Sequence, residues 1–408
     1  MASFNLTNFD AAMKDMYPYK KVENMVYKNN PLLAMLPKET TFPGRNATYA
    51  VEYGMTNGRS ATFATAQNNR SGTQIEDFVV TRVKDYAVVS VDNETLLAAD
   101  GNEGSLLDVA KSKTDSALHA LSRAMGRDVY RSGTGSIGQI HASPSLGNTT
   151  VELVAGHAIN FEVGMRLKAS ATDGSALYSG TLEVTGVDRD NDVLTVVGNA
   201  TDSIASLSAD DFLYVEGDFG AKMSGLDAWL PSTVTSDTFF GVDRTVDSTR
   251  LGGQRQTFAN SVMETIINAG VKVAREGGRP DALFMNPTDW AELAIDLEGR
   301  AAVAGEHNRR RYGAGESDAS FGFSSLSVAT PTGMVECFAD HNCPINVAYM
   351  LQLDTWKLKS LGPAPRMLDF DGLNGIRQSN EDGVEYRFGY YGNILCTAPG
   401  YNCRIALA

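Results

Sequence analysis

The stretch from Ser105 to Arg131 has the periodicity of one long helix, and it constrains the fold more than any other part of the sequence. Ser105 can serve as the N-cap with Asp108 three residues later, and glycines at 133 and 135 follow the last periodic residue. At 1.5 Å per residue the helix would be about 40 Å long, which indicates an extended, architectural protein. Its apolar residues recur at intervals of three and four, on one stripe: Leu106, Leu107, Ala110, Ala117, Leu118, Leu121, Ala124, Met125 and Val129.

The composition predicts a packed protein with an acidic surface. The chain has 408 residues, 43% of them hydrophobic, which is enough for two or three cores. Its formal net charge of −14 argues against nucleic-acid binding by clustered Lys and Arg, and suits a surface that lies beside nucleic acid without binding it. No apolar run could cross a bilayer and the N-terminus lacks a signal-peptide pattern, so we expect a soluble protein made in the cytoplasm.

The two segments before the helix are predicted to extend away from a compact body. Residues 1–45 are interpreted as an arm, because prolines interrupt any regular element. Residues 46–92 are interpreted as a long hairpin, with Ala47–Tyr53 as the outgoing side and Phe78–Val91 as the return. An isolated hairpin is barely stable in water, so we expect it to lie on a neighbouring subunit; an ordinary mobile loop is the alternative.

After the helix the pattern changes twice. Residues 136–222 contain short β-patterned runs between turn signals, which predicts a small β-barrel or sandwich inserted into the surrounding domain. Residues 223–355 return to mixed α/β, with a helix whose stripe runs from Phe258 to Val273. A strand at 282–285 follows, and Asn286 is a suitable cap for a second helix that begins at Pro287.

No motif predicts catalysis. The chain has no GxSxG, HExxH or P-loop, and its five histidines are scattered. Gly133–Gly138 matches GxGxxG, but it follows a helix and opens a β region, so it is interpreted as a helix stop and flexible hinge. We therefore expect no enzyme activity and no cofactor. The four cysteines are expected to be reduced thiols in a strand-rich core, with a metal site or disulfides as alternatives: Cys337, Cys343, Cys396 and Cys403.

One acidic segment resembles part of a calcium loop. Asp188, Asp190 and Asp192 alternate as the first ligands of such a loop do. Val193 stands where the glycine is required, and Asn199 stands where the last acid is required. A hairpin turn is the favoured interpretation, and these three aspartates remain a weak calcium candidate beside the alternative of a metal at the cysteines.

The order of the parts resembles the major capsid protein of tailed bacteriophages, an α+β fold also found in encapsulins and in the floor of herpesvirus shells. The resemblance covers the whole chain except residues 136–222, which look like an added domain. It rests on the order of the elements together with five segments: Asp92–Ala98 (DNETLLA), Gly225–Pro231 (GLDAWLP), Phe239–Arg244 (FFGVDR), Leu283–Pro287 (LFMNP) and Ala348–Trp356 (AYMLQLDTW).

The resemblance implies a domain organisation and a function. The chain would form hexamers and pentamers of an icosahedral shell around double-stranded DNA, in a virion assembled in the cytoplasm of a bacterial host. Portal, scaffold and decoration proteins are the implied partners, with no membrane. The implied parts are an N-terminal arm (1–45), an extended hairpin loop (46–92), a peripheral domain with the spine helix (93–135), an all-β insertion (136–222), an axial domain (223–355), and a return through the peripheral sheet with C-terminal strands (356–408).

Six residues are candidates for contacts between subunits: Arg59, Phe63, Arg70, Arg309, Arg310 and Arg311. A solvated loop is the simpler interpretation of the three consecutive arginines. Some relatives lock their shells by an isopeptide bond from a lysine in the extended loop. No lysine lies between Tyr53 and Val83, so no such bond is expected here, nor is an early cleaved scaffolding segment.

Two other functions fit parts of the sequence. An encapsulin-like compartment would have the same fold and would store an enzyme instead of a genome. A metal- or glycan-binding β module on an enzyme would place the binding function in residues 136–222. In the capsid interpretation, we expect that insertion to face outward and to contact neighbouring insertions or a decoration protein.

Overall fold

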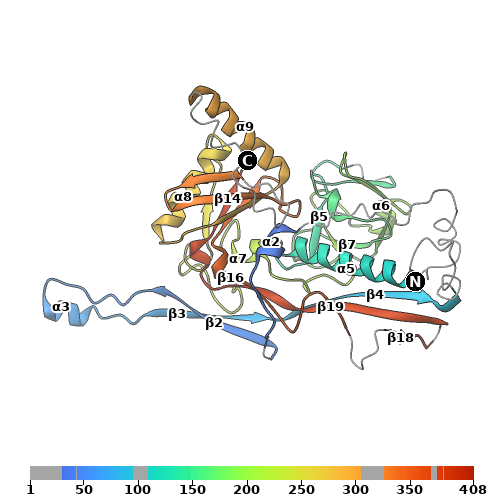
Figure 1. Ribbon diagram of the computed structural model, residues 1–408, viewed down its shortest axis with the longest axis horizontal. Helices are drawn as coiled ribbons and strands as arrows, with labels where there is room; N and C mark the ends of the chain where they lie inside the picture. Colours follow the sequence, from blue (N-terminus) through green and yellow to red (C-terminus); the bar gives the residue numbers. More distant parts are fainter. Residues whose placement is uncertain are drawn as a thin grey trace.

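The computed structural model describes residues 30–42, 44–94, 109–144, 146, 148–304, 326–368, 375–379 and 381–408. Within them the strands form three six-stranded sheets and one two-stranded sheet. Figure 1 shows two bodies standing side by side on a long strand ribbon, with the two-stranded hairpin projecting from one end. None of the helices described could span a membrane.

The ribbon is built on β19 (Gly383–Cys396), the longest strand described. β4 (Val83–Asp92) pairs with it antiparallel over ten residues, from Val83 opposite Gly392 to Asp92 opposite Gly383. Three short strands, β16, β17 and β18, pair with the other edge of β19, and a fourth, β1, pairs parallel with β16. They are β1 (Lys38–Glu39), β16 (Trp356–Ser360), β17 (Arg366–Met367) and β18 (Ile376–Arg377).

Helix α5 (Val109–Asp128) lies along one face of this ribbon. The expected stripe is buried against the strands at Ala117, Leu121 and Met125. The predicted start at Ser105 lies outside the described residues. The helix ends three residues before the predicted end, because the amide of Tyr130 bonds to the carbonyl oxygen of Arg127 in a tighter turn. Its 20 residues correspond to about 30 Å.

The projecting hairpin is shorter than predicted. It comprises β2 (Asn46–Gly54) and β3 (Gln74–Thr81), with the short helix α3 (Phe63–Asn68) at its tip. The expected return strand from 78 to 91 is divided at Arg82, whose amide makes the last backbone bond to Arg45. Beyond it the chain leaves β2 and pairs with β19 instead, so residues 83–92 belong to the ribbon.

Residues 136–222 fold as a closed β-barrel with its own core. The end strands β5 and β6 are joined by a bridge between Ile140 and Leu153, and the amide of Val154 donates to the carbonyl oxygen of Gln139. The inward side chains include Phe161, Leu167 and Leu213. The strand order is β5 (Ser136–Gln139), β10 (Phe212–Val215), β7 (Arg166–Ser170), β8 (Leu182–Asp188), β9 (Val193–Val196) and β6 (Thr150–Glu152), with short helices η1 (Ala158–Asn160) and α6 (Ala200–Ser203).

The barrel is pinned to the body instead of hanging on the flexible hinge that the glycine pattern suggested. Its incoming and outgoing segments run side by side, because the amide of Gly220 donates to Thr134 and that of Gly225 to Arg131, at 2.7 and 2.9 Å. Gly135 has φ +91°, and a Cβ there would lie 2.4 Å from the carbonyl oxygen of Asp218.

The third sheet carries helices α8 (Val262–Arg275) and α9 (Pro287–Ala304) on one face. Its opposite face, with Phe284 and Tyr349, packs into the core shared with the ribbon. Its strand order is β11 (Gln254–Gln256), β20 (Cys403–Ala406), β15 (Val347–Leu351), β12 (Ala282–Met285), β14 (Gly333–Ala339) and β13 (Leu326–Thr330).

Several local predictions are confirmed here and one is wrong. Strand 282–285 is present, and Oδ1 of Asn286 accepts from the amide of Thr288 at the start of α9. Phe258 is exposed and precedes α8, which is capped by Ser261 instead. After β19 the chain leaves the ribbon, and its last strand, β20, pairs with β11 and β15 of this sheet. The four cysteines are buried free thiols, as expected.

The Gly135→Ala substitution should destabilise the barrel attachment. A positive φ costs alanine about 1–2 kcal/mol, and the clash with Asp218 adds about 1–3 kcal/mol. Gly217→Ala is the matched control, because Gly217 has φ +95° but open space around it. Urea unfolding of the full chain should therefore show a larger loss for Gly135→Ala, and equal losses would contradict the close approach.

The barrel should lose stability in acid through His157. Burial, with a smaller effect of the Arg131 charge, lowers the pKa of His157 to about 3, and its Nδ1 accepts from the amide of Gln139 at 3.0 Å. The unfolded chain binds the proton near pH 6.5, so stability falls by about 1.4 kcal/mol for each pH unit between 6.5 and 3. His157→Asn keeps an acceptor and does not titrate, so its stability deficit relative to the parent should shrink as the pH falls. Parallel pH profiles in urea unfolding would contradict this.

Candidate inter-subunit surface

The base of the hairpin is fixed to the body by an aromatic cluster. Phe78 on β3 is fully buried, and its ring centroid lies 5.2 Å from that of Trp229 in α7 (Leu226–Trp229). Phe239 packs edge-on against Trp229 at 5.1 Å. The amide of Val79 donates to the carbonyl oxygen of Phe240 at 2.9 Å, so the backbone is bonded where the rings meet. These contacts set the direction in which the hairpin leaves the body.

A buried arginine closes this cluster. The Arg244 guanidinium lies 4.3 Å from the centroid of the Phe239 ring and donates to the carbonyl oxygen of Ala228 at 2.7 Å. Burial lowers the pKa of Arg244 to about 10, with the Arg255 charge as the smaller cause, so Arg244 remains charged at neutral pH. A buried cation over a ring and bonded to a carbonyl holds that segment rigidly in place.

Beyond its base the hairpin has no core. From Met55 to Ile75 every residue is exposed or half-exposed, and α3 buries none of its residues. Met55 is 84% exposed, Phe63 78% and Ile75 55%. The tip is held by polar bonds alone, such as the amide of Asn57 to Oγ of Ser71 at 2.8 Å. A six-residue helix is marginal in water, and the exposed apolar side chains leave the tip without packing that would hold it in place.

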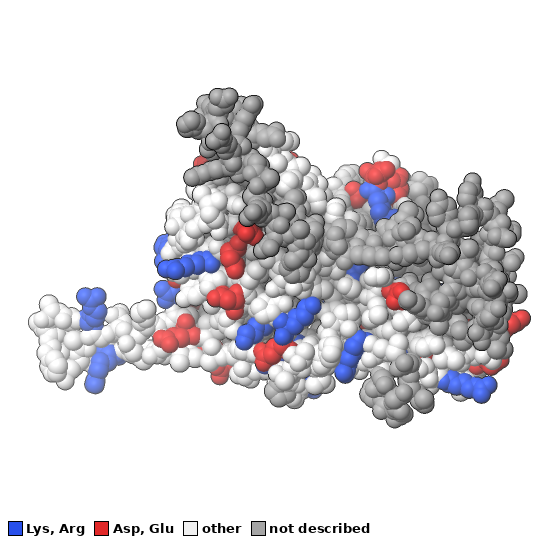
Figure 2. All heavy atoms as spheres, viewed as in Figure 1, with Lys and Arg blue, Asp and Glu red and all other residues white. Residues whose placement is uncertain are grey.

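The hairpin tip carries positive charge on an otherwise acidic molecule. Between Met55 and Ile75 the charged residues are Arg59 and Arg70, with no acid. Figure 2 shows basic side chains on the projecting end, and the acidic side chains lie on the body. Nε of Arg70 donates to the carbonyl oxygen of Gln67 at 2.9 Å, which ties its side chain to the end of α3.

The structure thus brings three of the proposed contact residues together. Arg59, Phe63 and Arg70 all lie on the exposed tip. The consecutive arginines Arg309–Arg311 lie outside the described residues.

The calcium candidates form a turn instead of a ligand set. Oδ1 of Asp188 accepts from the amides of Asp190 and Asn191, at 3.1 and 3.2 Å, and hydrogen bonds from Asn191 lower the pKa of Asp188. The Asp192 carboxylate accepts from the amides of Gly156 and Ala158. In the described part of the chain, no group of three or more His, Cys, Asp or Glu side chains could hold a metal ion.

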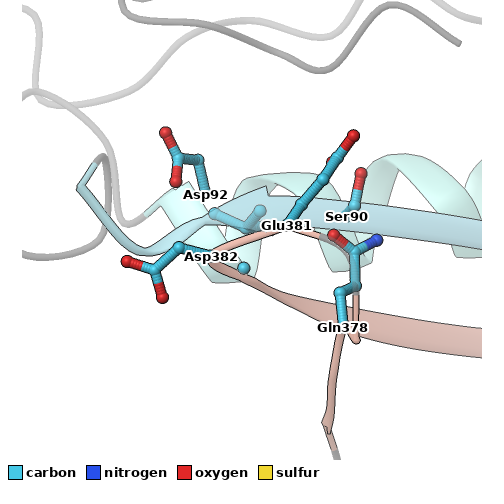
Figure 3. A pocket seen from close by; sticks show the side chains of 7 residues that line it. Ser90, Asp92, Gln378, Glu381 and Asp382 are labelled. Carbon is cyan, nitrogen blue, oxygen red and sulfur yellow. The ribbon is translucent and has the colours of Figure 1, made fainter.

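Sequence reasoning missed a groove at the far end of the ribbon, which Figure 3 shows. The end of β4 meets there the segment that precedes β19, nearly 300 positions away in the sequence. No local pattern marks such a groove, because only the pairing of β4 with β19 brings its sides together. The groove is lined by Ser90, Val91, Asp92, Gln378, Glu381, Asp382 and Gly383.

Comparison with known proteins identifies the fold. No family model and no curated protein matches the sequence. A chain of the cyanophage A-1(L) capsid asymmetric unit matches with a TM-score of 0.58 and 11% identity, over 98% of this chain and 99% of that chain. The capsid of the native GTA particle matches with a TM-score of 0.49 and 10% identity, over 100% of both chains. The capsid of Myoviridae phage XM1 matches with a TM-score of 0.48 and 8% identity, over 100% of this chain and 99% of that chain. The cyanophage match confirms the predicted α+β phage capsid fold.

Truncation to alanine should destabilise the subunit strongly at Phe78 and hardly at all at Phe63. Phe78→Ala removes a fully buried ring from the aromatic cluster and should cost about 3–5 kcal/mol. Phe63→Ala changes an exposed side chain and should stay within about 0.5 kcal/mol in the unassembled subunit. Urea unfolding of both variants measures the difference, and a large cost at Phe63 would mean that the tip has a core of its own.

Proposed function

We propose that the protein is the major capsid protein of a tailed phage, which assembles into an icosahedral head shell around double-stranded DNA. The observation that carries the proposal is a capsid fold over the whole chain combined with a hairpin that has no core of its own. Such a surface is stable in water only when another subunit covers it. Hexamers and pentamers of identical copies supply that cover by symmetry.

The parts of the chain take defined roles in this proposal. The hairpin at 46–81 contacts neighbouring copies, and the ribbon with α5 forms the peripheral domain. The sheet with α8 and α9 is the axial domain near the capsomer centre. The barrel faces outward, where its surface contacts neighbouring barrels or a decoration protein. Its net charge supports that orientation, because residues 136–222 contain 12 acidic and 4 basic residues, and an acidic domain repels packaged DNA.

The remaining roles follow from the same proposal. The shell is part of the virion, is assembled in the cytoplasm of the bacterial host, and meets a portal at one vertex; a scaffold can assist. The chain holds DNA by enclosure, without sequence-specific contacts, consistent with a net charge of −14. We propose a structural role without catalysis. Purified particles that contain an enzyme instead of DNA would identify the encapsulin-like compartment.

Removing the hairpin tip should prevent shell closure without unfolding the subunit. In this variant residues 54–74 are replaced by Asn-Gly, which joins the two strands by a tight turn. Since the tip buries no residue, the melting temperature of the subunit should change little. Electron microscopy of the expressed protein should show closed shells for the parent and none for the variant. Normal particles from the variant would refute the role of the hairpin.

A further inference from the structure

The hairpin tip contains an exposed asparagine that is followed by a glycine. Asn57 lies in the irregular segment between β2 and α3. Its backbone amide donates to Oγ of Ser71 at 2.8 Å, and that hydroxyl donates to the carbonyl oxygen of Asn57 at 3.5 Å. The backbone of Asn57 is therefore held, whereas no hydrogen bond among the described residues holds its side-chain amide. The sequence has one other Asn-Gly step, and its asparagine, Asn374, lies outside the described residues.

Gly58 leaves its backbone nitrogen open to the side chain of Asn57. Glycine has no side chain to crowd the approach of its own nitrogen to a neighbouring carbon, and its backbone rotates easily. The two groups belong to adjacent residues, so a reaction between them is intramolecular and has a high effective concentration. A Cβ at Gly58 would lie 3.4 Å from the carbonyl oxygen of Ala66 and 3.6 Å from Cγ of Arg70, so Gly58 lies beside the Arg70 side chain.

The charges of the tip favour loss of the Gly58 amide proton. Arg59 and Arg70 are the charged residues between Met55 and Ile75, and a nearby cation stabilises an anion that forms. The same stretch of sequence contains no acid and no histidine, so no carboxylate or imidazole of the tip can take the proton. Because the tip is exposed, hydroxide from the solvent can reach the amide and serve as the base.

We propose that Asn57 is a site of spontaneous modification, where the side-chain amide becomes a carboxylate by way of a succinimide. Hydroxide removes the amide proton of Gly58, and the nitrogen attacks Cγ of Asn57. A new C–N bond closes the ring, the C–N bond of the side-chain amide breaks, and ammonia leaves with a proton taken from water. Water then opens the ring at either carbonyl carbon, which yields aspartate or isoaspartate. Water is the one reactant besides the chain, and no group is oxidised or reduced.

The modification changes both the charge and the backbone of the tip. The net charge of residues 55–75 falls from +2 to +1, because a carboxylate appears in a stretch that has none. In the isoaspartate product the main chain also runs through the former side chain, so the backbone becomes longer between Asn57 and Gly58. The reaction needs the chain and water alone, so the inference does not rest on the proposed shell function.

Peptide mass spectrometry of the full-length, unassembled chain tests the proposal. During incubation in mildly alkaline buffer, the peptide with Asn57 should first lose the mass of ammonia and then gain the mass of water. The rate should rise in proportion to the hydroxide concentration. Asn68 and Asn69 are the internal controls, because they are exposed on the same tip but are followed by larger residues. They should react about tenfold or more slowly, since a side chain on the next residue hinders the attack.

Gly58→Ala is the matched variant. The added methyl group meets its neighbours at ordinary contact distance, 3.4 Å or more, so the tip should keep its structure. The variant should nevertheless slow ammonia loss at Asn57 by about tenfold or more, because the methyl group hinders the approach of the nitrogen. Circular dichroism establishes that each chain is folded, and Asn57→Asp supplies the reference peptide for the aspartate product.

Three results would overturn the modification site. They are an unchanged mass of the Asn57 peptide in the folded chain, equal conversion at Asn68 and Asn69, and an unchanged rate in Gly58→Ala. Each leaves the shell function standing, because the mass of the peptide does not depend on whether shells form.

Discussion

The contact between Phe78 and Trp229 is the one on which the rest of the molecule depends. Trp229 packs at the same time on Phe239 and on Trp356 of the ribbon, so one indole joins the hairpin, α7 and β16. Phe240 adopts φ +50°, an uncommon conformation for a bulky residue, and the bond from Val79 and the surrounding rings hold it there. The projecting hairpin can hold a fixed direction only if its base is rigid. The aromatic cluster makes the base rigid, and the tip stays exposed.

A second junction joins the barrel to the ribbon through buried charge, because Asp85 lies on β4. Nζ of Lys222 lies 2.6 Å from Oδ2 of Asp85 and 3.0 Å from Oδ2 of Asp218. Burial lowers the pKa of Lys222, but the carboxylates of Asp128, Asp85 and Asp218 outweigh it and raise the pKa. Buried ion pairs add little net stability, yet removing one partner leaves an uncompensated charge. The arrangement therefore fixes where the barrel sits more than it strengthens the fold.

The sequence predicted the elements well where the pattern was local. The α5 stripe, the cap at Asn286 and the barrel strands β6 to β10 follow from spacing that one segment contains, whereas β5 was interpreted as part of the hinge. The prediction failed where the choice of pairing partner decided which sheet a strand joins. Val83–Val91 alternates like the rest of the hairpin, and only pairing with β19 moves it into the ribbon.

The candidate inter-subunit surface likewise has one part that local sequence predicts and other parts that only the fold brings together. The exposed tip with Arg59, Phe63 and Arg70 could be found from composition, since a polar, acid-free stretch between strands has nothing to bury. The cluster around Trp229 lay in segments that carried the family resemblance, but its role became visible only when Phe78 was placed beside it. The acidic groove combines Asp92 with Asp382, and no sequence window contains both.

The entry and exit of the barrel also have a consequence for how such a chain can change over time. The two connecting segments are bonded to each other at Thr134 and Gly220, so the barrel begins and ends at nearly one point. A unit with adjoining ends can be gained, lost or exchanged for another module without altering the path of the spine beneath it. The lineage of this protein could therefore diversify what it displays while conserving how it is built.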